Sequence, residues 1–127
     1  MSNLLTISRL RTWRDCKRKH RLVYLDGWRP RREDEALSFG RLVHEGLEHW
    51  WTAPADQRLI AALARIRGRA QDLHQEAAVQ ELLRAYDRRW ALAMEAYEVL
   101  AVEATFTAPL INPETGAASR TFNLAGK

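Results

Sequence analysis

The sequence predicts an α+β fold in which a block of helices is followed by a β-hairpin. Apolar residues recur at helical spacing through most of residues 9–96, whereas residues 97–107 and 120–127 are rich in β-forming residues and flank a strong turn signal. A chain of 127 residues forms at most one domain, and it is long enough to bury a modest core.

The first helical region should begin near Arg9, because the hydroxyl of Ser8 can accept from free N–H groups of a first turn. Asp26-Gly27 and Pro30 should end this region. Its apolar face is marked by Leu10, Trp13, Cys16 and His20.

A second helix is predicted over residues 34–51, closed by Ala53-Pro54. Its apolar face is wide enough to pack on more than one side. Gly40 and Gly46 each cost up to about 1 kcal/mol of helix propensity relative to Ala, which close approach of another backbone would explain. One apolar stripe comprises Leu37, Gly40, His44, Leu47 and Trp51, and the other comprises Phe39, Val43, Gly46 and Trp50.

Two further helices are predicted over residues 56–67 and 72–96, with Gly68 as the break between them. The face of the first is marked by Leu59, Ala62, Leu63 and Ile66. The face of the second is marked by Val79, Leu82, Leu83, Tyr86, Trp90 and Met94.

The β-hairpin joins residues 97–107 to residues 120–127 through Asn112-Pro113-Glu114-Thr115-Gly116. No third strand is predicted. A two-stranded hairpin is marginal without helical cover, and an apolar edge left open on its last strand is a liability. We therefore expect further structure after Lys127.

Positive charge is concentrated between Arg9 and Arg32, a segment that contains ten Arg or Lys residues and only two acidic residues. Such a block suits a nucleic-acid backbone, although a solvated face is the alternative. Trp13 and Trp28 lie in the same block and can stack on unpaired bases, but Trp on an amphipathic helix more often belongs to a core. The candidate DNA-binding residues are Arg9, Arg14, Lys17, Arg18, Lys19 and Arg21.

The sequence favours a cytoplasmic protein without a membrane partner. A single cysteine fits a reducing compartment, and no apolar run approaches the roughly 20 residues that span a bilayer. Residues 1–6 show no charged leader followed by an apolar stretch, so no signal peptide is apparent.

His44 lies in Gly40-Arg41-Leu42-Val43-His44-Glu45. A zinc-protease reading fails because His44 and His49 are five residues apart, about 140° around a helix. A satisfied core histidine and a single metal ligand remain, and periodicity alone favours the core histidine.

Several short segments, in this order, resemble the N-terminal part of a RecB/AddB-type nuclease domain of the PD-(D/E)XK superfamily, which includes CRISPR-associated and phage exonuclease-like members. Gly40 and His44 match the family's Gly-x-x-x-His. Lys17 stands where the family usually has proline. The other resembling segments are Ile7-Ser8-Arg9-Leu10, Trp13, Cys16-Lys17-Arg18-Lys19-His20-Arg21-Leu22, Tyr86-Asp87-Arg88-Arg89-Trp90, Val102-Glu103 and Leu124-Ala125-Gly126-Lys127.

This resemblance implies that the hairpin begins the central mixed sheet of a restriction-endonuclease-like core, α/β in the full domain. It implies a deoxyribonuclease that uses Mg²⁺ or Mn²⁺ in DNA repair, recombination or phage DNA processing. Its substrate would be single-stranded DNA or duplex ends, and a helicase or another recombination subunit would fit as a partner. His44 would bind the metal ion. Glu103 is either a carboxylate that supports the metal pocket or an exposed strand residue paired with a nearby Arg.

The family's catalytic Asp would come two residues after Lys127, and its Glu-x-Lys and Gln-x-x-x-Tyr later still. Residues 1–127 are therefore expected to be the N-terminal part of the domain and to cleave nothing alone. Cys16 is either a buried thiol or, as in some relatives, one of about four iron–sulfur ligands, which a chain with one cysteine cannot supply. The alternatives are a non-catalytic nucleic-acid-binding module and a helical protein-interaction adaptor.

Overall fold

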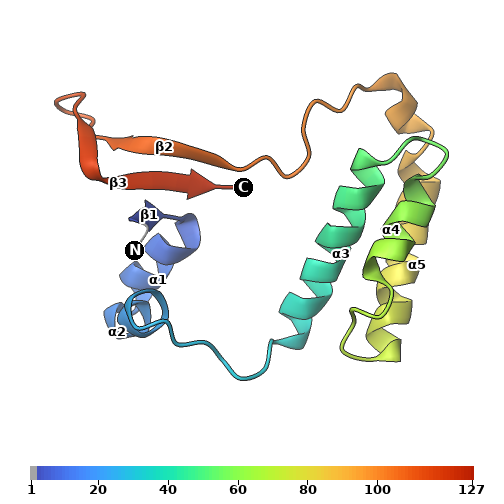
Figure 1. Ribbon diagram of the computed structural model, residues 1–127, viewed down its shortest axis with the longest axis horizontal. Helices are drawn as coiled ribbons and strands as arrows, with labels where there is room; N and C mark the ends of the chain where they lie inside the picture. Colours follow the sequence, from blue (N-terminus) through green and yellow to red (C-terminus); the bar gives the residue numbers. More distant parts are fainter. Residues whose placement is uncertain (1–2) are drawn as a thin grey trace. The chain divides into compact units, whose positions relative to one another are not determined.

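The computed structural model describes residues 3–127 and divides into two compact units (Figure 1). Arg32–Val102 form the helical unit, and the chain up to Arg31 together with Glu103–Lys127 forms the strand unit. The α+β class is confirmed. No helix within residues 3–127 is long and apolar enough to cross a membrane. Met1 and Ser2, part of the stretch in which no signal peptide is apparent, lie outside the described residues.

Three helices pack on one another in the helical unit: α3 (Glu35–Thr52), α4 (Arg58–Ile66) and α5 (Leu73–Trp90). A short 3-10 helix, η2 (Ala93–Ala96), follows, so the predicted helix over residues 72–96 is interrupted after Trp90. Gly68 breaks the chain after α4 with φ of +69°, as predicted. The buried apolar core comprises Leu42, Trp50, Ala62, Ile66, Val79 and Leu83.

Helix α3 agrees with the prediction in its bounds and in most of its wide apolar face, since Gly46 and Trp50 are buried and other stripe residues pack against the core. The exceptions are Leu37 and His44, which are exposed. Asp34 caps α3, accepting from the N–H groups of Ala36 and Leu37 at 2.9 and 3.3 Å. Leu37 of the first predicted stripe is 69% exposed. The buried residues follow one i, i+4 row, because α4 and α5 cover that side; they are Ser38, Leu42, Gly46 and Trp50.

The two glycines of α3 differ. A Cβ at Gly46 would lie 2.7 Å from Leu83 Cδ1, so close packing explains this glycine, through a side chain rather than a backbone. Nothing lies within 4 Å of a Cβ at Gly40, so the predicted close approach is wrong there.

The strand unit contains a mixed sheet of three strands in the order β1-β3-β2: β1 (Leu4–Leu5), β2 (Phe106–Ile111) and β3 (Ala118–Gly126). Strand β1 runs parallel to β3, whereas β2 and β3 form the predicted antiparallel hairpin. The prediction of no third strand is wrong, because a two-residue strand has too few residues to show alternation. Strand β3 is therefore central, and its predicted open edge is paired at Asn123 and Leu124.

The hairpin turn is confirmed. Asn112 Oδ1 accepts from Glu114 N at 2.8 Å, and Gly116 has φ of +68°. The first predicted strand is wrong over residues 97–105, since β2 begins only at Phe106. Residues 97–105 have β-forming side chains but pair with no strand of the described sheet.

The basic segment folds into three short helical pieces: α1 (Ile7–Asp15), α2 (Lys17–His20) and a π-helical turn, η1 (Arg21–Leu25). Thr6, not Ser8, caps α1, with its hydroxyl accepting from Arg9 N at 3.2 Å. Cys16 breaks the predicted continuous face, because its backbone is extended, with φ of −156°. Its thiol is exposed, so the expectation of a buried cysteine is also wrong.

Candidate metal ligand and nucleic-acid interface

His44 lies in the middle of α3, on the side away from the core. Leu42 and Gly46, two residues before and after it, are buried, and a separation of two residues is about 200° on a helix. His44 is therefore exposed, and the prediction of a core histidine is wrong. The same geometry leaves the imidazole on an accessible face, as a metal ligand requires.

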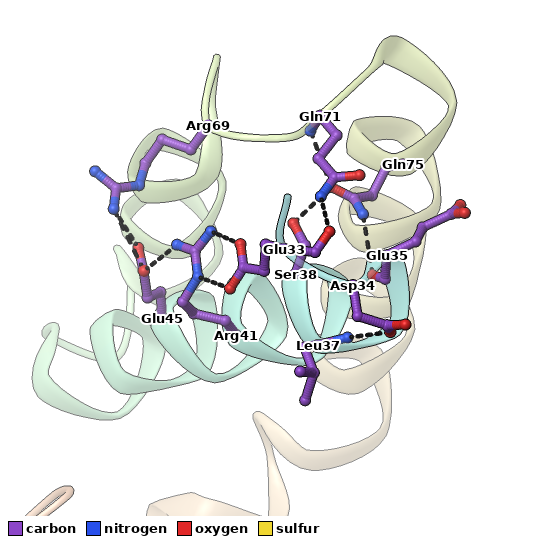
Figure 2. Close-up of polar contacts among 10 residues, drawn as sticks. All are labelled: Glu33, Asp34, Glu35, Leu37, Ser38, Arg41, Glu45, Arg69, Gln71 and Gln75. Atoms are coloured by element: carbon purple, nitrogen blue, oxygen red, sulfur yellow. Dashed lines mark hydrogen bonds and ion pairs between the residues drawn. The ribbon is translucent and has the colours of Figure 1, made fainter. Parts of the chain in front are cut away.

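Charged residues on both sides of His44 are held by ion pairs (Figure 2). The Arg41 guanidinium donates to both oxygens of Glu33, at 3.2 and 3.0 Å, and to Glu45 at 3.0 Å. Arg69 Nη2 lies 3.0 Å and Arg65 Nε lies 3.4 Å from Glu45 Oε2. Glu45 thus ties α3 to α4 and to the residues that follow α4.

These contacts shift the pKa values of both carboxyl groups. Burial raises the pKa of Glu45, but hydrogen bonds from Arg41 and Arg69 and the charges of Arg69 and Arg65 lower it more, so the net pKa is below its ordinary value. The Arg41 hydrogen bond similarly lowers the pKa of Glu33. The lowered pKa favours the ionised form of Glu45, which pairs with Arg41, Arg65 and Arg69.

A buried amide fixes the start of α3 against α5 (Figure 2). Gln75 is 3% exposed; its Oε1 accepts from Ser38 Oγ at 3.3 Å and from Gln71 N at 3.0 Å, while its Nε2 donates to Glu35 O at 3.4 Å. Sequence reasoning missed this residue. The available signal was its spacing, four residues before Val79 on the buried side of the helix.

The basic segment presents most of the predicted DNA-binding cations on its surface. Two of them form exposed ion pairs, Arg14 with Asp15 at 3.3 Å and Arg21 with Asp26 at 3.8 Å, and such pairs contribute little. Arg9 differs in being half-buried. The exposed candidates are Arg14, Lys17, Arg18, Lys19 and Arg21.

Aromatic side chains lie among these cations. Trp13 and Trp28 are 52% and 67% exposed, so neither is a core residue in the described structure. Lys17 Nζ lies 5.1 Å from the Trp13 ring centroid, and His20 stacks on Tyr24 at 5.3 Å. Tyr24 was not among the sequence candidates, although its i, i+4 spacing from His20 was a usable signal.

The profile of the PD-(D/E)XK nuclease superfamily matches residues 4–127. The chain belongs to the PD-(D/E)XK nuclease superfamily. No curated protein and no solved structure gives a significant match. Nucleases of this superfamily act on nucleic acid and typically use divalent metal ions. The exposed basic surface is the candidate for binding the nucleic acid, and His44 is the candidate for binding the metal ion.

Glu103, the supporting carboxylate expected for a PD-(D/E)XK nuclease, is not in a strand. It precedes β2 in a bend with φ of +51°. Its Oε2 lies 3.4 Å from Lys127 Nζ, so a lysine is one of its partners. Glu103 belongs to the strand unit and His44 to the helical unit.

The described residues do not by themselves fit a resident metal ion. Within residues 3–127 no three His, Cys, Asp or Glu side chains form a group that could hold one. A hard divalent ion prefers several oxygen ligands, whereas one imidazole supplies a single nitrogen. Cys16 is the chain's one cysteine, and its Sγ accepts from Lys19 N at 3.4 Å, so it offers one of the roughly four ligands of an iron–sulfur cluster.

Proposed function

We propose that residues 1–127 supply the DNA-guiding surface and one metal ligand of a RecB/AddB-type DNA nuclease. The observation that carries this proposal is the superfamily match over residues 4–127, joined to an exposed segment rich in cations and aromatics. Its substrate is single-stranded DNA or a duplex end, processed in repair, recombination or phage DNA metabolism. A helicase or another recombination subunit is the proposed partner, in the cytoplasm.

The basic surface binds DNA phosphates in this proposal, and His44 is the ligand offered to Mg²⁺ or Mn²⁺. Glu103, which precedes β2, is the proposed supporting carboxylate of the complete nuclease. Phosphodiester hydrolysis needs carboxylates that hold the metal ions which activate water. Because residues 3–127 contain no group of three candidate ligands, we expect binding but no cleavage from this chain alone.

The binding role is tested by replacing Arg14, Lys17 and Arg18 with Ala. Affinity for a fluorescent oligonucleotide should fall, and the slope of log K against log salt should flatten by about 0.7–0.9 for each phosphate that the variant no longer neutralises. The matched control removes three cations from α5 of the helical unit, Arg84, Arg88 and Arg89. An equal fall in affinity for both triple variants would contradict a localised binding surface.

The catalytic part is tested by incubating the purified 127-residue protein with labelled DNA and Mg²⁺ or Mn²⁺. We expect intact DNA at all times. Robust cleavage that EDTA abolishes would overturn the roles given to His44 and Glu103, because a complete metal centre would then lie within these residues.

A second candidate is a non-catalytic nucleic-acid-binding module. The pairing of β1 with β3 favours it, because the predicted open edge of β3 is covered at Asn123 and Leu124. This candidate requires tight DNA binding that is identical with and without Mn²⁺. A protein-interaction adaptor would instead show negligible DNA affinity even at low salt.

A further inference from the structure

A pocket in the strand unit is lined by side chains that the proposed roles leave unused. It lies where β1, α1, α2 and β3 come together, and is lined by Leu5, Arg9, Leu10, Trp13, His20 and Phe122. Parallel pairing of β1 with β3 sets Leu5 opposite Leu124, two residues beyond Phe122. Helix α1 begins two residues after β1, which brings its first turns to the same place.

The apolar lining of this pocket is open to solvent. Trp13, Leu10 and Phe122 are 52%, 43% and 38% exposed. In the helical unit, by contrast, Trp50 is fully buried, with its Nε1 donating to Asp87. An indole and a phenyl ring that line one exposed pocket offer flat apolar surface to a ligand with an aromatic face of its own.

The polar lining is held in place. Arg9 Nη1 donates to Leu4 O at 2.9 Å, and Arg9 Nε donates to His20 Nε2 at 3.3 Å. His20 is stacked on Tyr24, and the Arg9 guanidinium lies 5.8 Å from the same Tyr24 ring. These contacts restrict the motion of the Arg9 side chain at the pocket wall, so less conformational entropy is lost when a ligand binds.

Positive charge surrounds the pocket beyond its lining. Lys17 Nζ lies 5.1 Å from the Trp13 ring centroid, so a cation accompanies the exposed aromatic face. Arg14 adjoins Trp13 in sequence and is exposed. A ligand that suits these surroundings joins a flat, uncharged, aromatic group to negative charges a few ångströms away.

We propose that this pocket receives an unpaired nucleobase of a DNA strand, stacked on Trp13 and Phe122, while the neighbouring phosphates meet Lys17 and Arg14. This inference rests on the proposed DNA-binding function and deepens it. A base inside a duplex has both faces covered by its neighbours, so only an unpaired base can enter. The pocket therefore selects single-stranded or frayed DNA over intact duplex.

The test compares two polyanions of equal charge by fluorescence anisotropy at fixed salt. One is a ten-nucleotide oligothymidylate, and the other is the same sugar-phosphate chain without bases. The wild-type protein should bind the first more tightly, and Trp13→Leu should remove roughly 10-fold of that affinity while leaving the abasic chain unaffected. Phe122→Leu should also lower the affinity for the oligothymidylate. Agreement between the two variants would show that the loss does not come from misfolding of Trp13→Leu alone.

Tyr97→Leu is the matched control. Tyr97 is 68% exposed but belongs to the helical unit, outside the basic segment, and does not line this pocket, so its replacement should leave both affinities unchanged. Equal effects of Trp13→Leu and Tyr97→Leu, or equal wild-type affinity for the two chains, would overturn the pocket assignment and leave DNA binding intact. If the wild type binds neither chain, the proposed function fails, and this inference fails with it.

Discussion

The helical unit and the strand unit differ in where their apolar side chains lie. All described residues that are buried belong to the helical unit. In the strand unit Trp13, Trp28 and Phe106 are 52%, 67% and 59% exposed. The hydrophobic burial that stabilises the described chain is therefore concentrated in one unit, while the other presents apolar and cationic surface.

The residues that stabilise the fold therefore differ from those that are available to contact a ligand. The same difference is seen within α3, where Leu42 and Trp50 are buried and His44 is exposed. Substitutions of the candidate binding residues should consequently change affinity with little effect on folding. Substitutions of core residues should lower the stability of the fold and have little direct effect on affinity.

The largest effect should come from Leu83→Ala. Leu83 is 1% exposed within the core of the helical unit, and its side chain lies against Gly46 of α3. Truncating a buried leucine removes its transfer free energy and leaves a cavity, which costs about 2–5 kcal/mol. Urea unfolding followed by far-UV circular dichroism measures the decrease in stability.

Leu82→Ala makes the same chemical change one residue earlier on α5. Leu82 is 44% exposed, so its replacement should lower the free energy of unfolding by less than about 1 kcal/mol. A decrease as large as that of Leu83→Ala would show that α5 buries a different face.

A smaller effect should follow from Gln75→Ala, which removes the amide between α3 and α5. Ser38 Oγ, which is buried, and Gln71 N would each lose this acceptor, and leaving a buried polar group unsatisfied costs about 1–3 kcal/mol. Hydrogen exchange should quicken at the first turn of α3. The control is Gln80→Ala, which removes a partly exposed hydrogen bond from Gln80 to Glu76 and should change stability by less than about 0.5 kcal/mol.

The helical unit was the more predictable part of the fold because its signals are local. Asp34 at the start of α3 and Gly68 after α4 each depend on one residue's own backbone or side-chain chemistry. In the strand unit, only the Asn112 turn was predictable on the same ground. Strand β1 could not be predicted, because two residues become a strand only by pairing with β3, more than a hundred residues later. For the same reason residues 97–105 were wrongly predicted as a strand.

The candidate site was predictable in residue type but not in exposure. Spacing placed His44 and Cys16 on apolar faces, yet both are exposed, because which side of a helix is buried depends on the elements that pack against it. The pocket beside Trp13 combines residues from both ends of the chain and has no local signature. The concentration of charge predicted exposure better than the apolar spacing did, since ten cations in one short segment are difficult to bury.

The smallest effect should be the pH dependence that Glu45 gives to the helical unit. Because its pKa is lowered in the folded state, its ion pairs stabilise the fold above the unfolded pKa of about 4.3, and this contribution disappears as the pH falls through the folded pKa. Glu45→Gln should reduce stability at pH 7 by about 1 kcal/mol or less, and this difference should shrink as the pH falls below about 4. Thermal unfolding from pH 7 to pH 3 measures it. Glu81→Gln, which removes an exposed pair with Arg84, should change stability little at pH 7. A constant difference between wild type and Glu45→Gln across that range would mean that the charge of Glu45 adds nothing and that its side chain acts through packing alone.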